Sequence, residues 1–160
     1  MASNGYDILI NDINKLLRND RVMIAAVNSV LVEQKKRIFQ QGKASNEQKI
    51  GSYSTDPISI ARKNQSRNTG KTYFKGGYKE YKGLTGKGNS FVNLDNTGQQ
   101  KMDLSTFVLG KNEYGIGFNN DFNADKRDWM EAKYRKEIYA TTPKEDNLFD
   151  KVIQFELDKL

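Results

Sequence analysis

Hydrophobic residues recur at helical spacing through the first quarter of the chain. Steps of three and four residues separate six apolar side chains, which places them on one face of a helix: Tyr6, Leu9, Ile10, Ile13, Leu16 and Leu17. A second helix is predicted over residues 21–41, with Gly42 at its C-terminal end. Its first half is apolar and its second half charged, so we expect the first half to lie in the core and the second to project.

The helical pattern disappears over residues 43–90, where serine, asparagine, glycine and lysine predominate. Ile58 and Ile60 alternate with Ser59 and are compatible with a short strand. The rest of the segment shows neither helical nor strand periodicity. We therefore predict an extended loop or arm that is either disordered or ordered by a partner.

Regular structure is predicted to return near residues 91–94, ahead of a turn at residues 96–98. Alternation with a period of two follows this turn. Two strands, over residues 104–109 and 114–118, flank a short Gly/Asn turn and predict a β-hairpin. Gly115 and Gly117 fall on one face of the second strand. We expect a helix or a neighbouring backbone to approach that face closely.

Two helices are predicted to follow the hairpin. The first is capped by Asp121 or Asn123, ends near residue 135 and carries Trp129, the single tryptophan, as an expected core anchor. After a possible edge strand at residues 138–140, Thr142 is followed by Pro143 and then by Glu145. This order combines a capping box with proline in the first turn, which predicts a helix start.

These elements predict an α+β fold in a single domain over residues 1–160. It comprises two N-terminal helices (1–42), a long extended basic loop (43–90), and a small, mainly antiparallel sheet with a β-hairpin followed by two C-terminal helices (91–160). At 160 residues the chain is long enough to bury a core without metal or disulfide staples.

The composition argues against an enzyme. The chain has neither cysteine nor histidine, the residue types that most often ligate transition metals and, for histidine, transfer protons near neutral pH. We expect no catalytic residue, no metal and no cofactor. No apolar run approaches the roughly 18 residues that cross a bilayer, and the N-terminus lacks the basic-then-apolar order of a signal peptide. We therefore expect a soluble intracellular protein with no membrane contact.

Positive charge is concentrated in residues 57–90. Eight lysines and arginines stand against one acid, Glu80, so this segment carries +7 in a chain of net charge +6. Four aromatic residues are interleaved with the basic ones. Such a segment fits either a contact with another subunit or phosphate neutralisation with base stacking on nucleic acid.

Several short signatures occur in one order along the chain. They are Arg37-Ile38-Phe39-Gln40-Gln41-Gly42, Ile50-Gly51-Ser52-Tyr53-Ser54, Tyr78-Lys79-Glu80-Tyr81-Lys82, Val92-Asn93-Leu94-Asp95-Asn96-Thr97-Gly98, Ile116-Gly117-Phe118-Asn119-Asn120, Ala124-Asp125-Lys126 and Ile138-Tyr139-Ala140. In this combination, over about residues 35–158, the chain resembles the virion morphogenesis, or tail completion, family of tailed bacteriophages, which is related in fold to neck and head–tail joining proteins.

The resemblance implies a structural virion protein without catalysis. It would be assembled in the host cytoplasm into a homo-oligomeric ring of six or twelve copies at the neck or tail. The ring would contact adjacent portal, connector or tail proteins and would surround the path of the genomic DNA. Non-specific nucleic-acid binding by residues 57–90 is the alternative function.

Two groups of side chains are candidates for the contacts of the arm. Aromatic rings provide large contact area with few rotors, so one group is expected at the subunit interface and outside the core: Tyr53, Tyr73, Phe74, Tyr78, Tyr81 and Lys82. The other group is expected to meet DNA or an acidic partner: Arg62, Lys63, Arg67 and Lys71.

Overall fold

The structure is a computed structural model that describes residues 10–11, 14, 20–61, 70–95, 97–111 and 113–159. The helix predicted over residues 6–17 falls largely outside these ranges. The expected α+β class is confirmed. The elements in chain order are α2 (Asp20–Lys35), the π-helical turn η1 (Lys36–Gln40), β1 (Ile58–Ala61), β2 (Lys71–Phe74), α3 (Gly77–Leu84), α4 (Gln99–Asp103), β3 (Leu104–Gly110), β4 (Glu113–Phe118), α5 (Asp121–Tyr134) and α6 (Pro143–Leu157).

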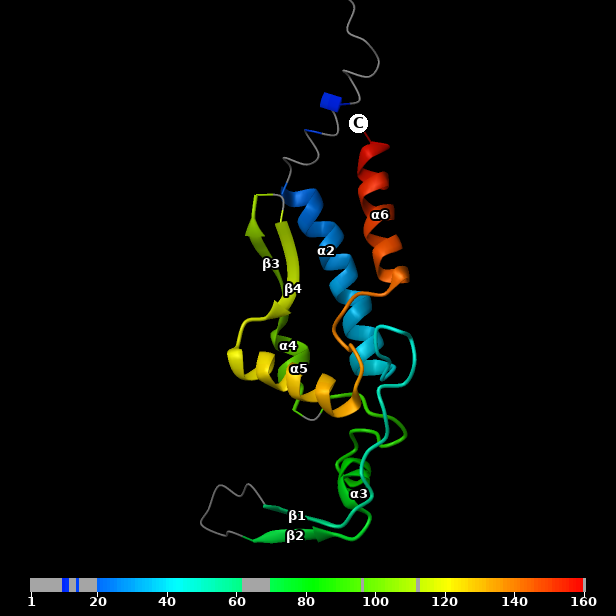
Figure 1. The fold of residues 1–160 in the computed structure, drawn as a ribbon, viewed down its shortest axis with the longest axis vertical. Coiled ribbons are helices and arrows are strands. Elements are labelled where there is room, and N and C mark those ends of the chain that lie inside the picture. The colour runs from blue at the N-terminus through cyan, green and yellow to red at the C-terminus, as the bar shows by residue number, and fades with distance from the viewer. Residues whose placement is uncertain are drawn as a thin grey trace, which may run out of the picture.

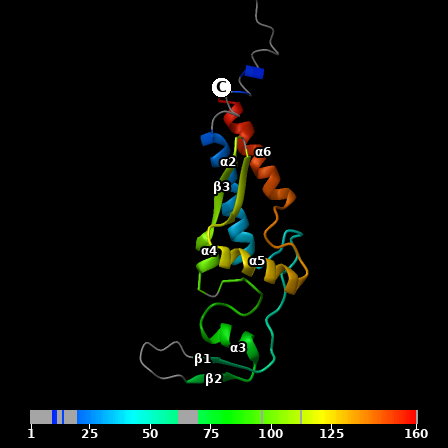
Figure 2. The same ribbon diagram turned by 60° about the vertical axis from the view of Figure 1, so that its left-hand side comes forward.

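The molecule is elongated and has two parts (Figures 1 and 2). The larger part, which we call the body, holds α2, α6, α5 and the β3–β4 hairpin. The smaller part, the lobe, consists of the β1–β2 hairpin and α3, residues 58–61 and 70–84. Extended segments without helix or strand, on either side of the lobe in the sequence, connect it to the body. The lobe thus projects from one end of the molecule.

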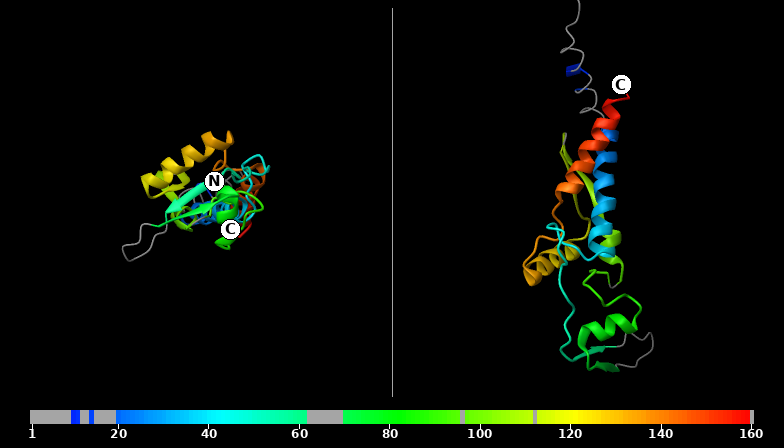
Figure 3. Two further views of the ribbon diagram at one scale, coloured as in Figure 1. Left: turned by 90° about the horizontal axis from the view of Figure 1, so that it is seen from below. Right: turned by 90° about the vertical axis from the view of Figure 1, so that its right-hand side faces the viewer.

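Helix α2 is the central element of the body. It lies between α6 on one side and the β3–β4 hairpin on the other (Figures 1 and 3). Val22, Ala26 and Val30 recur every four residues and are buried, as expected for the first half of the helix. The prediction for this half of the helix is confirmed.

The second half of the predicted helix does not project, and that prediction is wrong. The last turn widens into η1, and its residues Arg37, Ile38 and Phe39 are all buried. Seven residues form the apolar core here: Ile38, Phe39, Ala44, Ile50, Val92, Leu104 and Ile138. Most of them come from loops rather than from helices or strands, so the core is small and lies at the C-terminal end of the α2–η1 helix.

Gly42 ends this helix as predicted. Its φ of +64° lies in the left-handed region that glycine adopts without steric cost. A Cβ at this position would also meet the Phe91 ring and the Val92 carbonyl oxygen. The helix end therefore requires glycine both for its backbone conformation and for the close approach of residues 91–92.

The β3–β4 hairpin is confirmed, but the role expected for its glycines is not. Helix α2 lies on the face of Thr106, whose hydroxyl donates to Asn28 Oδ1 at 3.0 Å. Gly115 and Gly117 face away from α2, and their nearest neighbours are the side chains of Leu109 and Phe107 on the paired strand. A Cβ at either position would meet no atom of a described helix within 4 Å. They leave room for cross-strand side chains instead.

The segment predicted as an extended loop contains regular structure. The strand expected at residues 58–60 is confirmed as β1, which pairs antiparallel with β2 so that Ile58 lies opposite Phe74. Neither β2 nor α3 was predicted. Glycines at 76, 77 and 83 obscure the pattern, because they leave only Phe74, Tyr78 and Tyr81 to mark the apolar face.

Several predictions for the C-terminal third are corrected. The N-cap of helix α5 is Asn120, whose side chain accepts from the Phe122 amide, and not Asp121 or Asn123. Trp129 is 56% exposed and is not a core anchor. Residues 138–140 form no strand, because side chains of α2 and η1 bind their carbonyl oxygens in place of a neighbouring strand. Residues 91–94 are also irregular, and α4 was not predicted.

The predicted start of α6 is confirmed in detail. Thr142 Oγ1 accepts from the Glu145 amide at 3.1 Å, and Glu145 Oε2 accepts from the Thr142 amide at 2.9 Å. We expect Thr142→Ala to lower the free energy of unfolding by about 1 kcal/mol, because one amide of the first turn loses its acceptor. Urea unfolding followed by circular dichroism measures this, with Thr142→Ser as the control that keeps the hydroxyl. Equal losses for both variants would contradict the role of the cap.

Within the residues the structure describes, no helix has the length and apolar character needed to cross a membrane.

Candidate functional site

The lobe presents a positively charged surface at the end of the molecule. From residue 70 to residue 90 there are five lysines and one acid, Glu80, whose carboxylate accepts from the Gly76 amide at 2.7 Å. Four of these lysines are exposed: Lys71, Lys75, Lys79 and Lys87. Glu80 is the one exposed acid of residues 70–90, so the exposed charge of this segment is net positive.

A row of aromatic rings connects the lobe to the segment that leads into it. The ring centroids of Tyr53 and Tyr78 are 5.4 Å apart, those of Tyr78 and Tyr81 5.5 Å, and those of Phe74 and Tyr81 5.5 Å. These are the separations of favourable tilted and edge-to-face contacts. The row therefore joins β2, α3 and residue 53 into one small apolar cluster inside the subunit.

Lys82 fastens the lobe to the segment that returns to the body. Its side chain is only 1% exposed, and its ammonium donates to Asn93 Oδ1 at 3.1 Å and to the Asp95 carbonyl oxygen. The Tyr53 hydroxyl donates to the same Asn93 Oδ1 at 2.8 Å. Burial lowers the pKa of Lys82, and the Asp95 carboxylate acts in the opposite direction. Lys82 is thus an internal anchor of the lobe.

Burial raises the pKa of Tyr53 to about 12, above its ordinary value of 10. Between pH 10 and 12 the unfolded chain loses this proton while the folded chain keeps it, so folding stability falls as the pH rises. We expect Tyr53→Phe to make this fall less steep, although a smaller slope remains because burial also raises the pKa of Tyr78 and Tyr134. Urea unfolding at pH 9 to 12 measures both slopes. Identical slopes would show that the phenol of Tyr53 does not titrate in this range.

The structure separates the predicted interface residues into two kinds. Phe74 and Lys82 are buried within the subunit, whereas Tyr53, Tyr78 and Tyr81 are half-buried and pack in one row with Phe74. These five side chains therefore have packing partners inside the subunit, and their contact with another subunit stays a prediction. Tyr73 differs, because its ring is 65% exposed on β2.

The four predicted DNA or acidic-partner contacts are only partly placed. Lys71 is exposed at the start of β2. Arg62, Lys63 and Arg67 lie outside the described residues. The contact of these side chains with a partner therefore stays a prediction.

A cleft of about 690 Å³ lies between the lobe and α5; we call it the aromatic cleft. Five aromatic side chains line it: Tyr53, Tyr78, Phe122, Trp129 and Tyr134. Two lysines of α5 lie over its exposed rings, with Lys126 Nζ 4.2 Å from the centroid of Phe122 and Lys133 Nζ 4.8 Å from that of Trp129. The sequence pattern does not indicate this site, because a single tryptophan such as Trp129 is typical of a core position and the lysines of α5 form no motif.

Donors outnumber charged acceptors in the aromatic cleft. Lys82, Lys126 and Lys133 line it, and among the described residues no aspartate or glutamate does. Gln100 also lines the cleft; this residue is 7% exposed, and its buried side-chain amide nitrogen has no hydrogen-bond partner in the described part of the chain. The cleft therefore suits a ligand that combines an aromatic surface with negative charge.

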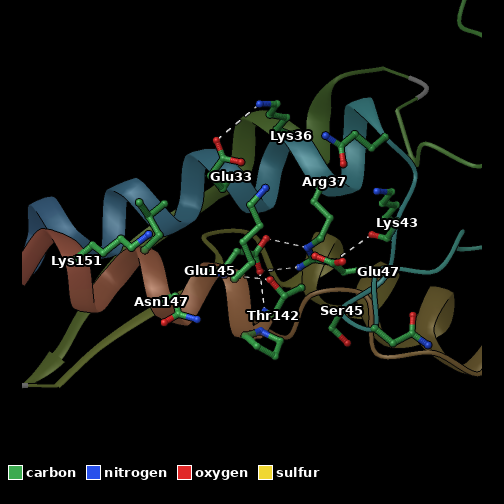
Figure 4. Close-up of a pocket in the computed structure, with 15 residues that line it drawn as sticks. Glu33, Lys36, Arg37, Lys43, Ser45, Glu47, Thr142, Glu145, Asn147 and Lys151 are labelled. Carbon is green, nitrogen blue, oxygen red and sulfur yellow. Dashed lines mark hydrogen bonds and ion pairs between the residues drawn. The ribbon is translucent and has the colours of Figure 1, made fainter.

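A second, wider groove of about 1210 Å³ lies between the end of α2 and the start of α6 (Figure 4). At its base the Arg37 guanidinium donates to both carboxylate oxygens of Glu145, at 2.8 and 3.3 Å. It also donates to the carbonyl oxygens of Lys43, Ile138 and Ala140, at 3.2, 3.0 and 2.8 Å. This buried pair joins four segments of the body, and its polar atoms are occupied by each other, so we assign it a structural role.

The remaining chemistry of the described residues is limited. No three carboxylates in this part of the chain lie close enough to hold a metal ion. Comparisons with protein-family models, curated proteins and solved structures found no match to this chain.

Proposed function

We propose that the chain is a structural subunit of a tailed-phage virion that forms a homo-oligomeric ring at the neck or tail, as the sequence resemblance implies. The observation that best supports this proposal is the projecting lobe. It is joined to the body by extended segments and fastened through few side chains, chiefly Lys82 and Tyr53 with Asn93. A lobe that projects beyond the body of its own subunit is suited to contact a neighbouring copy of the chain.

The distribution of apolar side chains supports the same proposal. Ten large hydrophobic residues of the described chain are exposed, against a core cluster of seven buried residues. They lie on the lobe, on the hairpin, at residue 10 and on the four helices α2, α4, α5 and α6, rather than in one patch. A subunit that is surrounded by neighbours in a ring would cover several such surfaces at once.

Cryo-electron microscopy of the neck and tail of purified particles tests the proposal. We expect a closed ring of six or twelve copies, with residues 57–90 lying on the adjacent subunit. Absence of the protein from particles would reject the structural function.

Non-specific nucleic-acid binding is the second candidate, favoured by the exposed lysines of the lobe and the exposed ring of Tyr73. If this is the main function, affinity for DNA should fall steeply with salt, with a slope near −0.9 for each phosphate contacted on duplex DNA. Lys75→Glu combined with Lys79→Glu should reduce that slope by about 2. Fluorescence anisotropy with labelled DNA measures it, with Lys144→Glu combined with Lys151→Glu, on the body, as the matched control. Equal slopes for the two double variants would exclude the lobe as the binding surface.

A further inference from the structure

We propose that the aromatic cleft is one half of a subunit contact, and that its occupant is the C-terminal end of α6 from a second copy of this chain. This inference rests on the proposed function, because it names the contact through which the ring would be built. On the lobe it involves only the wall that faces the cleft, and it does not involve the basic residues predicted to meet DNA or an acidic partner.

The cleft itself requires an occupant from outside the subunit. Phe122 and Trp129 expose aromatic rings on its α5 side, each with a lysine of the same helix over it. Gln100, which also lines the cleft, has a buried donor nitrogen without a partner among the described residues. Exposed rings beside lysines gain most from a partner that covers the rings and supplies negative charge.

The end of α6 has this chemistry. Outside the cleft, the exposed aromatic side chains of the described chain are Tyr73 and Phe155. Tyr73 lies between Lys71 and Lys75 in the sequence, and their charge would repel the lysines of the cleft. Phe155 is 61% exposed near the end of α6, with Lys159 Nζ 4.0 Å from its ring centroid. Lys159 pairs with Glu156 at 2.6 Å, which leaves the Asp158 carboxylate as the net negative charge of this helix end. The helix C-terminus adds the partial negative charge of its free carbonyl groups.

The contact must join two copies rather than two parts of one subunit. The C-terminal end of α6 lies at the opposite end of the molecule from the lobe, which forms one wall of the cleft (Figures 1 and 2). The two surfaces differ, so the contact is head-to-tail, and each copy can offer its helix to one neighbour and its cleft to another. Head-to-tail contacts close into a ring when the rotation between copies permits it.

Cross-linking can test the contact in the full chain, because the sequence contains no cysteine and each introduced thiol is the only one. An affinity-tagged Lys159→Cys variant is mixed with Gln99→Cys, which places a thiol on the cleft and keeps all its rings, and is treated with a short bismaleimide. The control is Lys159→Cys mixed with Asn147→Cys. We expect the yield of the mixed cross-linked product to be at least about tenfold above the yield in this control, roughly the excess of a specific contact over random encounter. A yield no higher than this control overturns the contact.

Two further sets of variants test the chemistry of the contact. Phe155→Ala in the tagged chain should reduce the mixed product about tenfold, as for an aromatic anchor, while Val32→Ala, another exposed apolar residue, should not change it. Lys126→Glu with Lys133→Glu should also reduce it, and Glu156→Lys with Asp158→Lys in the other copy should restore it. Failure of both the Phe155 loss and the charge-swap rescue overturns the proposal.

The outcomes separate this inference from the proposed function. If the wild-type protein forms a ring of subunits in particles but the yield of the mixed product stays at the control level, the proposed function is retained and this contact is wrong. If the protein is absent from particles, the proposed function fails independently. Sedimentation velocity of Phe155→Ala then shows whether any self-association of the protein in solution depends on the aromatic ring of Phe155.

Discussion

Replacing Arg37 with alanine is expected to lower the free energy of unfolding by about 3–5 kcal/mol, as for other buried ion pairs that lose one partner. The Glu145 carboxylate would stay buried with its charge uncompensated, and three carbonyl oxygens would lose a donor. The bound segments include the start of α6 and the irregular residues 138–140, so the loss should affect the whole body. Chemical unfolding followed by circular dichroism measures the change.

The neighbouring Lys36→Ala provides the matched control. Lys36 and Glu33 form an exposed pair at 3.8 Å, so its removal should change stability by less than about 1 kcal/mol. Arg37→Lys should not restore the wild-type value, because a single ammonium cannot reproduce the planar donor geometry that reaches the carboxylate and three carbonyls at once. A loss below about 1 kcal/mol for Arg37→Ala would show that the pair contributes little to the body.

The second large effect is expected at Gly77, the first residue of α3. Its φ is +68°, and a Cβ there would meet the Asp56 carbonyl oxygen and lie 2.6 Å from the Thr55 carbonyl carbon. Both atoms belong to the backbone and cannot rotate away as a side chain can. Gly77→Ala should therefore cost more than about 2 kcal/mol, the sum of a left-handed alanine and the steric conflict.

The cost should fall on the lobe and leave the body folded. Helix α3 is tied to the preceding segment by a backbone hydrogen bond from the Lys79 amide to the Ser54 carbonyl oxygen, 3.0 Å long, and displacement of residue 77 would break it. Amide hydrogen exchange should show faster exchange in residues 77–84, with α2 and α6 unchanged. If the lobe contributes to assembly, self-association should be lost at the same time.

Gly76→Ala is the control for this experiment. Gly76 has a φ of −87°, and its added Cβ would lie 3.2 Å from the Glu80 side chain, which can move. We expect a change of less than about 1 kcal/mol. Equal protection of α3 in both variants would contradict the account of Gly77.

The candidate site shows which of its features a local residue pattern predicts and which it does not. The sequence predicted that Tyr53, Phe74, Tyr78, Tyr81 and Lys82 act together, and the structure brings them together. Within one subunit, four of them pack as a row of rings, and Lys82 finds its acceptors on residues 93 and 95. Whether an aromatic or a long basic side chain faces inward depends on partners that the local pattern does not contain.

The sequence by itself determined the features that depend on near neighbours. The helix end at Gly42, the capping box at Thr142 and Glu145 and the β3–β4 hairpin all follow from backbone geometry and hydrogen bonds within a few residues. Only the tertiary structure decided which side chains are buried. Arg37 is buried because Glu145 lies 108 residues away in sequence but 2.8 Å away in space, and Trp129 is exposed because the small core is filled from loops. Burial is a property of these distant contacts, so a local pattern of charged and apolar residues does not specify it.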